Sequence, residues 1–181
     1  MTHSLVIMGV SGCGKSSLGE AVASALAQPL IEGDNFHSAA NNAKMTSGTP
    51  LTDADRQAWL AELGQQLRQH AHGAVLTCSA LKLRYRQKLR AASPGLRFAF
   101  LNITPSEALL RVASRAGEHL FPVSLVDSQF AALESPSDEA GVLTLDATEP
   151  LPKLTARITD WLAASATAAA AANTATGAAA N

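Results

Sequence analysis

A glycine-rich stretch near the amino terminus has the residue types and the spacing of a phosphate-binding loop. Residues 8–17 read MGVSGCGKSS, which matches the pattern G-x-x-x-x-G-K-[ST] at every fixed position. The glycines let successive backbone N–H groups converge on phosphate oxygens, and a helix that starts at the loop adds partial positive charge. Lys15 then bridges the outer phosphates and Ser16 ligates Mg²⁺. The stretch predicts a site for a nucleoside triphosphate with Mg²⁺, bound by Gly9, Ser11, Gly12, Cys13, Gly14, Lys15, Ser16 and Ser17.

Two acidic residues are candidates for ordering the magnesium shell and for orienting the acceptor of the phosphoryl group. Glu32 and Asp34 follow the short apolar run PLI, at the end of an expected strand, and would both point toward the phosphate loop in a parallel sheet. The expected third strand ends in Thr-Cys-Ser without an acid, so a metal-orienting carboxylate must come from elsewhere. We predict that Glu32 orders the magnesium shell and that Asp34 orients or deprotonates the acceptor hydroxyl. A solvated loop acid or a helix cap is the alternative for either residue.

Basic residues occur in two pairs with i, i+4 spacing, which places each pair on one face of a helix. Arg111 and Arg115 precede the segment AGEHLFP and suit a lid, about residues 112–130, that neutralises the transferring phosphoryl group. Lys82 and Arg86 follow the expected third strand, where they could meet an anionic acceptor. A solvated basic face is the alternative for both pairs.

Strands that alternate with helices must position these residues. Apolar runs predict strands at 5–8, 29–32, 74–77, 96–101 and 141–146, and helical periodicity predicts helices between them. Thr52 and Asp55 are spaced like a capping box at a helix start, and residues 35–51 are expected to be mobile or partly helical. The pattern predicts a three-layer α/β fold with a five-stranded parallel sheet and helices on both faces.

Length and composition favour one domain, residues 1–162, followed by an alanine-rich tail. The chain has 181 residues, 47% of them hydrophobic, and a net charge of −1, which argues against electrostatic capture of nucleic acid or membrane. Two cysteines without metal-like spacing, and no signal or membrane-spanning segment, lead us to expect a cytoplasmic protein. Residues 163–181 are expected to extend the last helix by a turn or two and then to be disordered.

Size and motifs narrow the kind of triphosphate chemistry. The sequence has no N-K-x-D segment for reading guanine and no second motor module, which favours a small-molecule or nucleotide kinase. The alternatives are a kinase of another hydroxylated acid such as shikimate, or of a nucleoside monophosphate. A third is a non-catalytic module in which nucleotide binding orders residues 116–123 for a partner protein.

Four blocks of the sequence together resemble the gluconokinase family. They are MGVSGCGKSS, EGDNFHSAANNAKMTSGTPLTDADRQAWL, CSALKLRYRQKLR and LVDSQFAALESP, and the resemblance runs in order from about residue 5 to 162. It implies phosphorylation of D-gluconate at its 6-hydroxyl by ATP, and the fold of nucleoside monophosphate kinases with strand order 2-3-1-4-5 and a lid. It also implies a homodimer.

The resemblance also implies roles for individual residues. It puts Asp34 and His37 at the sugar-acid site, with Arg56, Lys82 and Arg86 available for the carboxylate and hydroxyls of gluconate. The loop from Asp146 to Pro150 would line the adenine, with Arg111 stacking on its other face.

Two positions depart from the family pattern. The lid reads RAGEHLFP, which leaves open whether His119 contacts phosphate, and Cys13 stands where Ser or Ala is common. Because Cys13 lies near a helix N-terminus and beside Lys15, we hypothesise a reactive thiol that MgATP protects; two inert cysteines are the alternative.

Overall fold

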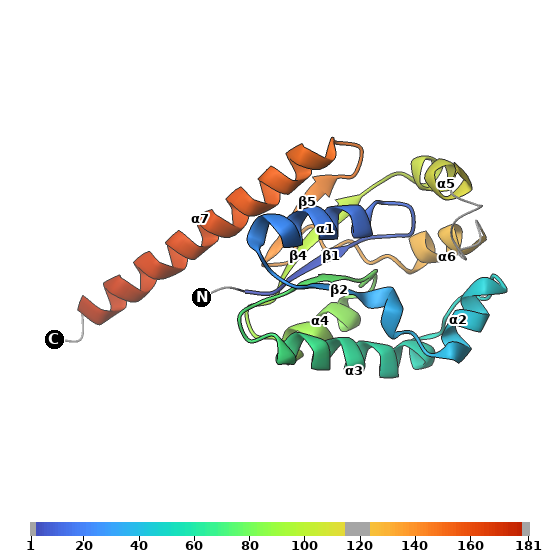
Figure 1. Cartoon of the computed structure of the whole chain (residues 1–181), viewed down its shortest axis with the longest axis horizontal. Helices are drawn as coiled ribbons and strands as arrows, with labels where there is room; N and C mark the ends of the chain where they lie inside the picture. Colours follow the sequence, from blue (N-terminus) through green and yellow to red (C-terminus); the bar gives the residue numbers. More distant parts are fainter. Residues whose placement is uncertain (1–2, 115–123, 179–181) are drawn as a thin grey trace.

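A five-stranded parallel sheet forms the middle of the molecule (Figure 1). The computed structural model describes residues 3–114 and 124–178. The strand order is β2-β3-β1-β4-β5, which confirms the predicted topology. The strands are β1 (Leu5–Met8), β2 (Leu30–Glu32), β3 (Val75–Thr77), β4 (Arg97–Asn102) and β5 (Val142–Asp146).

Helices cover both faces of the sheet, as the three-layer prediction requires. Leu5 and Ile7 of β1 pack in a core cluster with residues of α1 and α7, whereas Val6 and Met8 pack in a second cluster with α3 and α4. Since neighbouring residues of a strand point to opposite faces, this strand is buried on both sides. The helices are α1 (Lys15–Leu26), the short 3₁₀ helix η1 (Gly33–Phe36), α2 (Ala39–Thr46), α3 (Asp53–Gln69), α4 (Leu83–Ala92), α5 (Pro105–Ser114), α6 (Ser124–Ala132) and α7 (Leu151–Ala178).

Residues 35–51, which are expected from the sequence to be mobile or partly helical, contain α2, and side-chain caps hold the starts of α2 and α3. Ser38 caps α2 by accepting a hydrogen bond from the backbone N–H of Asn41 at 3.2 Å. The predicted capping box is present, because Thr52 Oγ1 accepts from Asp55 N at 3.2 Å and Asp55 Oδ2 accepts from Thr52 N at 2.8 Å. The side chain of Asn41 donates to the backbone oxygen of Asp55 at 2.9 Å. This contact ties α2 to the start of α3.

Helix α7 is longer than the sequence analysis predicts. It continues through the alanine-rich segment to Ala178, beyond the one or two extra turns expected after Leu162. Alanine has the highest intrinsic helix propensity, and no proline interrupts residues 163–178. Among the described helices, none is long and apolar enough to cross a membrane.

The carboxyl ends of the five strands define the edge of the sheet at which the candidate site lies. The segments that follow β1, β2 and β3 carry the phosphate loop, η1 and the start of α4. Parallel strands bring these segments together because their carboxyl ends share one edge. In Figure 1 this edge faces α2, α5 and α6, away from the end of α7.

Candidate active site

The predicted phosphate loop curls tightly between β1 and α1. Gly9, Gly12 and Gly14 have φ angles of 143°, 81° and 98°, in the region that side chains other than glycine rarely adopt. A Cβ atom at Gly12 would lie 2.8 Å from the backbone oxygen of Ala108 in α5, so the loop also needs glycine for space. The amino end of α1 opens directly from the loop, and its first turn contains no acidic residue. The backbone can therefore present N–H groups and a helix N-terminus to phosphate.

The side chains of Ser16 and Glu32 meet beside this loop, as the end-of-strand argument predicts. Ser16 Oγ donates a hydrogen bond to Glu32 Oε2 at 3.2 Å. Thr77, the last residue of β3, donates to the same Glu32 oxygen at 2.8 Å and accepts from Gly33 N at 3.3 Å. The other oxygen, Glu32 Oε1, is buried and has no hydrogen-bond partner among the described residues.

Thr77 is a site residue that the sequence analysis did not identify. The sequence feature that could have identified it is its hydroxyl at the end of β3, where a metal-orienting acid was expected and is absent. Because β2 and β3 are neighbours with Glu32 in register with Thr77, the hydroxyl reaches across to the carboxylate. Thr77 thus orients the Glu32 carboxylate.

Asp34 and His37 form an acid–imidazole pair on η1 and its carboxyl end. The distance from His37 Nε2 to Asp34 Oδ1 is 3.9 Å, with the Asp34 side chain 80% exposed and the His37 side chain 4% exposed. The imidazole stacks on Trp59 with ring centroids 4.2 Å apart, and Trp59 Nε1 donates to the Gly33 backbone oxygen at 2.8 Å. Trp59 therefore holds η1 and the imidazole together, and leaves the Asp34 carboxylate open to an acceptor.

Burial sets the charge of this imidazole. Desolvation lowers the pKa of His37; the nearby Asp34 carboxylate opposes that effect and the Arg56 guanidinium adds to it. His37 is therefore neutral at pH 7, and its ring can both donate and accept hydrogen bonds. His37 Nδ1 is buried and has no hydrogen-bond partner among the described residues.

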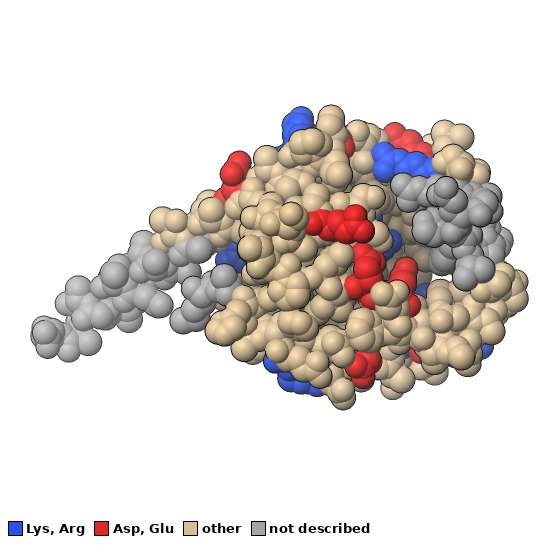
Figure 2. Space-filling model, in the orientation of Figure 1, with Lys and Arg blue, Asp and Glu red and all other residues tan. Residues whose placement is uncertain are grey.

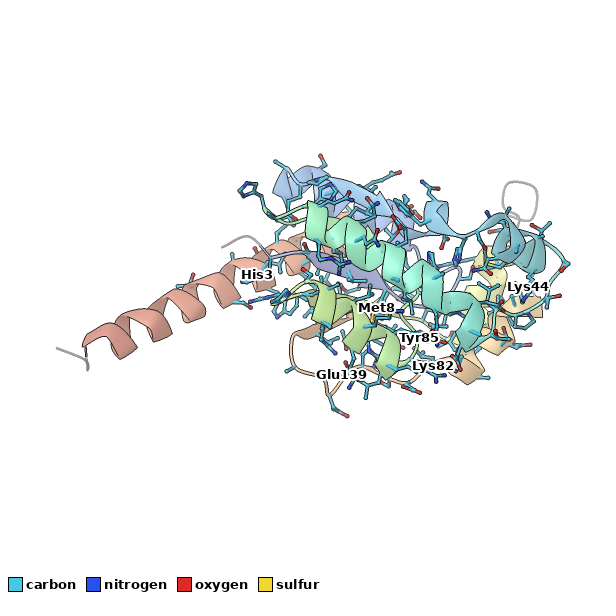
Figure 3. The ribbon with its side chains drawn as sticks, turned by 90° about the horizontal axis from the view of Figure 1, so that it is seen from below. His3, Met8, Lys44, Lys82, Tyr85 and Glu139 are labelled. Carbon is cyan, nitrogen blue, oxygen red and sulfur yellow. The ribbon has the colours of Figure 1, made fainter. Side chains whose placement is uncertain are left out.

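Arg56 and Lys82 lie around Tyr85 on the same side of the site. The Arg56 guanidinium carbon and Lys82 Nζ are each 5.9 Å from the centroid of the tyrosine ring. Lys82 also forms an ion pair with Asp53 at 2.9 Å, and Figure 3 shows Lys82 beside Tyr85. Hydrogen bonds from Tyr85 and Lys82 lower the pKa of Asp53 to about 2. The Arg56 guanidinium donates to the Leu51 backbone oxygen and lies close enough to His37 to affect its pKa, whereas Lys82 is already paired with Asp53.

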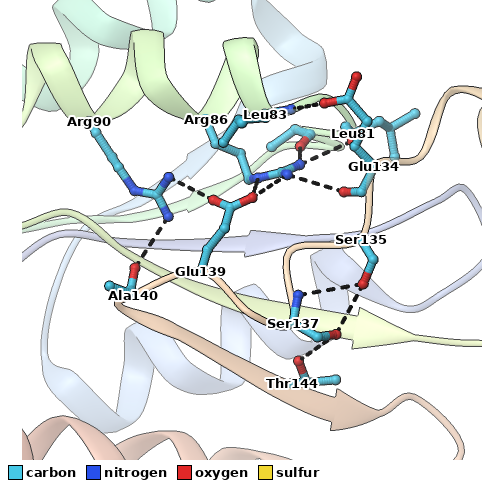
Figure 4. A network of polar contacts seen from close by, with 11 residues as sticks. Leu81, Leu83, Arg86, Arg90, Glu134, Ser135, Ser137, Glu139, Ala140 and Thr144 are labelled. Carbon is cyan, nitrogen blue, oxygen red and sulfur yellow. Dashed lines mark hydrogen bonds and ion pairs between the residues drawn. The ribbon is translucent and has the colours of Figure 1, made fainter.

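The structure does not support the substrate role expected for Arg86. Its side chain is fully buried, and it donates five hydrogen bonds (Figure 4). They go to the Glu139 carboxylate and to the backbone oxygens of Ala80, Leu81 and Glu134. A guanidinium has five N–H groups, so none remains for gluconate. Lys82 is the residue before the first turn of α4, whereas Arg86 lies within the helix, so the two side chains do not share one helix face as expected.

Arg111 links the phosphate loop to the segment expected to line the adenine. One Nη atom donates to the Ala147 backbone oxygen at 2.9 Å and the other to the Cys13 backbone oxygen at 3.5 Å. Pro150 directly precedes α7 and accepts a hydrogen bond from Lys153 N at 2.9 Å. Arg111 and the segment after β5 therefore adjoin the phosphate loop. Arg115 and His119 belong to residues 115–123, outside the described part of the predicted lid.

The structure also argues against a reactive Cys13. The side chain is 2% exposed, and burial raises the pKa of its thiol even though Lys15 and Arg111 act in the opposite direction. Burial likewise raises the pKa of Cys78 to about 12. Both residues are free thiols whose reactive, ionised form is disfavoured at neutral pH.

On the face seen in Figure 2, acidic side chains gather beside a hollow in which basic side chains are visible. The residues described above likewise combine the carboxylates of Glu32 and Asp34 with the cationic side chains of Lys15, Arg56 and Lys82. This combination suits transfer of a phosphoryl group to an anionic alcohol, in which the protein mainly positions groups and neutralises charge.

Comparisons with known proteins agree with this chemistry. A family model described as "AAA domain" matches residues 5–136. A gluconokinase of Gluconobacter oxydans is 45% identical over 142 residues, covering 77% of this chain and 79% of the relative. The thermosensitive gluconokinase of Escherichia coli is 40% identical over 157 residues, covering 84% and 83% of the two chains. The crystal structure of a gluconokinase from Sinorhizobium meliloti superposes with a TM-score of 0.82 and 44% identity, covering 89% of this chain and 91% of that chain.

Proposed function

The chain belongs to the gluconokinase family, and from this premise we propose that it transfers the terminal phosphoryl group of ATP to the 6-hydroxyl of D-gluconate. The products are 6-phospho-D-gluconate and ADP. One observation supports the assignment above the others: Glu32 touches Ser16 of the phosphate loop, and Asp34, two residues further on, pairs with His37. A single short segment therefore joins the phosphate-binding half of the site to the acceptor half.

The residues of the site have separate roles in an in-line transfer of the phosphoryl group. Lys15 and the N–H groups of the loop stabilise negative charge on the transferring phosphoryl group. Asp34 accepts the proton of the attacking hydroxyl as the new O–P bond forms and the bond to ADP breaks. Arg56 and Lys82 attract the carboxylate of gluconate, and neutral His37 hydrogen-bonds a hydroxyl. We assign Arg115, on the predicted lid, to charge neutralisation at the same phosphoryl group.

Ser16 and Glu32 fit a magnesium ion. Both supply oxygen ligands, which Mg²⁺ prefers, and it commonly uses one or two protein groups together with phosphate oxygens and water. The buried Glu32 Oε1, which has no partner among the residues described, is the atom a cation would satisfy. Bound there, Mg²⁺ supplies positive charge that offsets the charge of the phosphates.

Removing the Thr77 hydroxyl tests this magnesium site. In Thr77→Val the Glu32 carboxylate loses the 2.8 Å hydrogen bond that orients it, with little change in side-chain shape. We expect the Mg²⁺ concentration for half-maximal activity to rise about 10- to 100-fold, as is typical when a partner of a metal ligand is removed. Steady-state assays across a magnesium titration measure this. Thr77→Ser keeps the hydroxyl and is the control; an unchanged magnesium dependence in Thr77→Val would remove Thr77 from this role.

A panel of acceptors tests the proposed function itself. Coupled detection of ADP should show turnover that requires both gluconate and Mg²⁺, with far lower kcat/KM for shikimate and for nucleoside monophosphates. A higher kcat/KM for another acceptor would transfer the same mechanism to that substrate. ATP binding without any acceptor-dependent turnover would instead favour a nucleotide-dependent binding module.

Two further expectations stand beside this proposal. The homodimer rests on the family resemblance, and light scattering on the purified chain measures its mass directly. A cytoplasmic location rests on the sequence analysis, and fractionation of cells that express the full chain tests it.

A further inference from the structure

Two long side chains hold one peptide group of the phosphate loop from opposite sides. The backbone oxygen of Val10 accepts a hydrogen bond from Lys15 Nζ at 2.9 Å. The next atom of that peptide group, Ser11 N, donates to Gln129 Oε1 at 2.7 Å. Gln129 lies on α6, 118 residues further along the chain. The contact therefore connects the loop to α6, a helix that lies largely within the predicted lid.

The position of Lys15 indicates that this peptide group faces the outer phosphates of a bound nucleotide. The lysine of a phosphate loop reaches the β- and γ-phosphates of the nucleotide. Since Lys15 Nζ lies against Val10 O, the Val10–Ser11 end of the loop is the end that faces the outer phosphates. The backbone N–H of Ser11 is a single donor. A γ-phosphate oxygen that reached this N–H would have to replace Gln129 Oε1.

We propose that Gln129 is a specificity-determining residue that competes with the γ-phosphate of ATP for the Ser11 N–H. A phosphate oxygen is charged and forms the stronger hydrogen bond, so ATP displaces the glutamine. ADP lacks the γ-phosphate, so the Ser11–Gln129 contact persists in its presence. ATP therefore breaks the Ser11–Gln129 contact between the loop and α6, whereas ADP leaves this contact in place. This inference rests on the ATP site of the proposed function.

Removing the glutamine acceptor gives the first test. In Gln129→Leu the Ser11 N–H is free, so binding of the non-hydrolysable ATP analogue AMP-PNP should tighten about 2- to 10-fold, the equivalent of one neutral hydrogen bond. ADP affinity should change by less than about two-fold, because ADP does not compete for that donor. Calorimetric titrations of the full chain with both nucleotides, at one magnesium concentration, give the two dissociation constants.

A second variant and a spectroscopic readout separate this role from a structural one. Gln129→Glu keeps an acceptor at Ser11 and adds negative charge near the terminal phosphate, so it should weaken AMP-PNP binding more than ADP binding. Without nucleotide, the amide proton resonance of Ser11 should move upfield in Gln129→Leu, which has lost the hydrogen bond. Gln65→Leu makes the same chemical change at an exposed position of α3 and should alter neither measurement.

The outcomes distinguish a failure of the role proposed for Gln129 from a failure of the proposed function. Equal shifts of AMP-PNP and ADP affinity in both variants, or an unmoved Ser11 resonance, would overturn the role of Gln129 alone. If the unaltered chain binds neither nucleotide, the proposed function fails and this inference fails with it. Opposite shifts of AMP-PNP affinity in Gln129→Leu and Gln129→Glu, with smaller shifts for ADP, support the competition.

Discussion

Asp34→Asn is expected to lower kcat about 10²- to 10⁴-fold, the range for loss of a general base. The carboxylate is 80% exposed, so its replacement by an amide of the same shape leaves the packing of η1 intact. Trp59 continues to hold the segment through Gly33 and His37. An amide cannot accept the proton of the acceptor hydroxyl. Steady-state kinetics with gluconate, together with calorimetric binding of MgADP, separate the loss of chemistry from any loss of nucleotide affinity.

The control for this variant is Asp138→Asn, which removes an exposed carboxylate from the segment between α6 and β5. It should leave kcat unchanged. If Asp34→Asn has full activity, Asp34 has no part in proton transfer. If its kcat and its MgADP affinity fall together, the effect comes from disruption of the site rather than from the missing base.

Arg86→Met is expected to lower the free energy of unfolding by about 3–5 kcal/mol, the cost of breaking a buried ion pair by removing one partner. The fully buried guanidinium satisfies the Glu139 carboxylate and three backbone oxygens. Methionine fills much of the volume but donates no hydrogen bond, so these acceptors are left without it. Urea unfolding followed by circular dichroism gives the free energy.

The matched control is Arg157→Met on α7, which removes an exposed arginine paired with Glu149. An exposed pair of this kind contributes about 0.2–1 kcal/mol. The comparison also tests the corrected assignment of Arg86. If Arg86→Met costs no more stability than Arg157→Met but raises the KM for gluconate more than about tenfold, a loss of one charged hydrogen bond, the substrate role is restored.

Local patterns were sufficient to predict the phosphate loop, the five strands and the approach of Glu32 to the loop, whereas the strand order came from the family resemblance. The loop residues are contiguous, and β1 is a short apolar run that is typical of a strand buried on both faces. Glu32 approaches the loop because the carboxyl ends of parallel strands share one edge of the sheet. Asp34 was expected at the end of the same strand, but β2 ends at Glu32 and Asp34 lies on η1. The capping box between Thr52 and Asp55 was likewise determined by residues three apart.

Contacts between segments far apart in the sequence determined the surroundings of the other site residues. Spacing placed Arg86 on a helix face, but the partner that buries it, Glu139, lies 53 residues away on a segment that packs over α4. Thr77 reaches Glu32 across 45 residues, and Gln129 reaches Ser11 across 118. Proximity to Lys15 suggested a reactive Cys13, but burial outweighs that charge. A sequence pattern determines which face a side chain occupies, whereas packing determines what covers that face and whether water remains there.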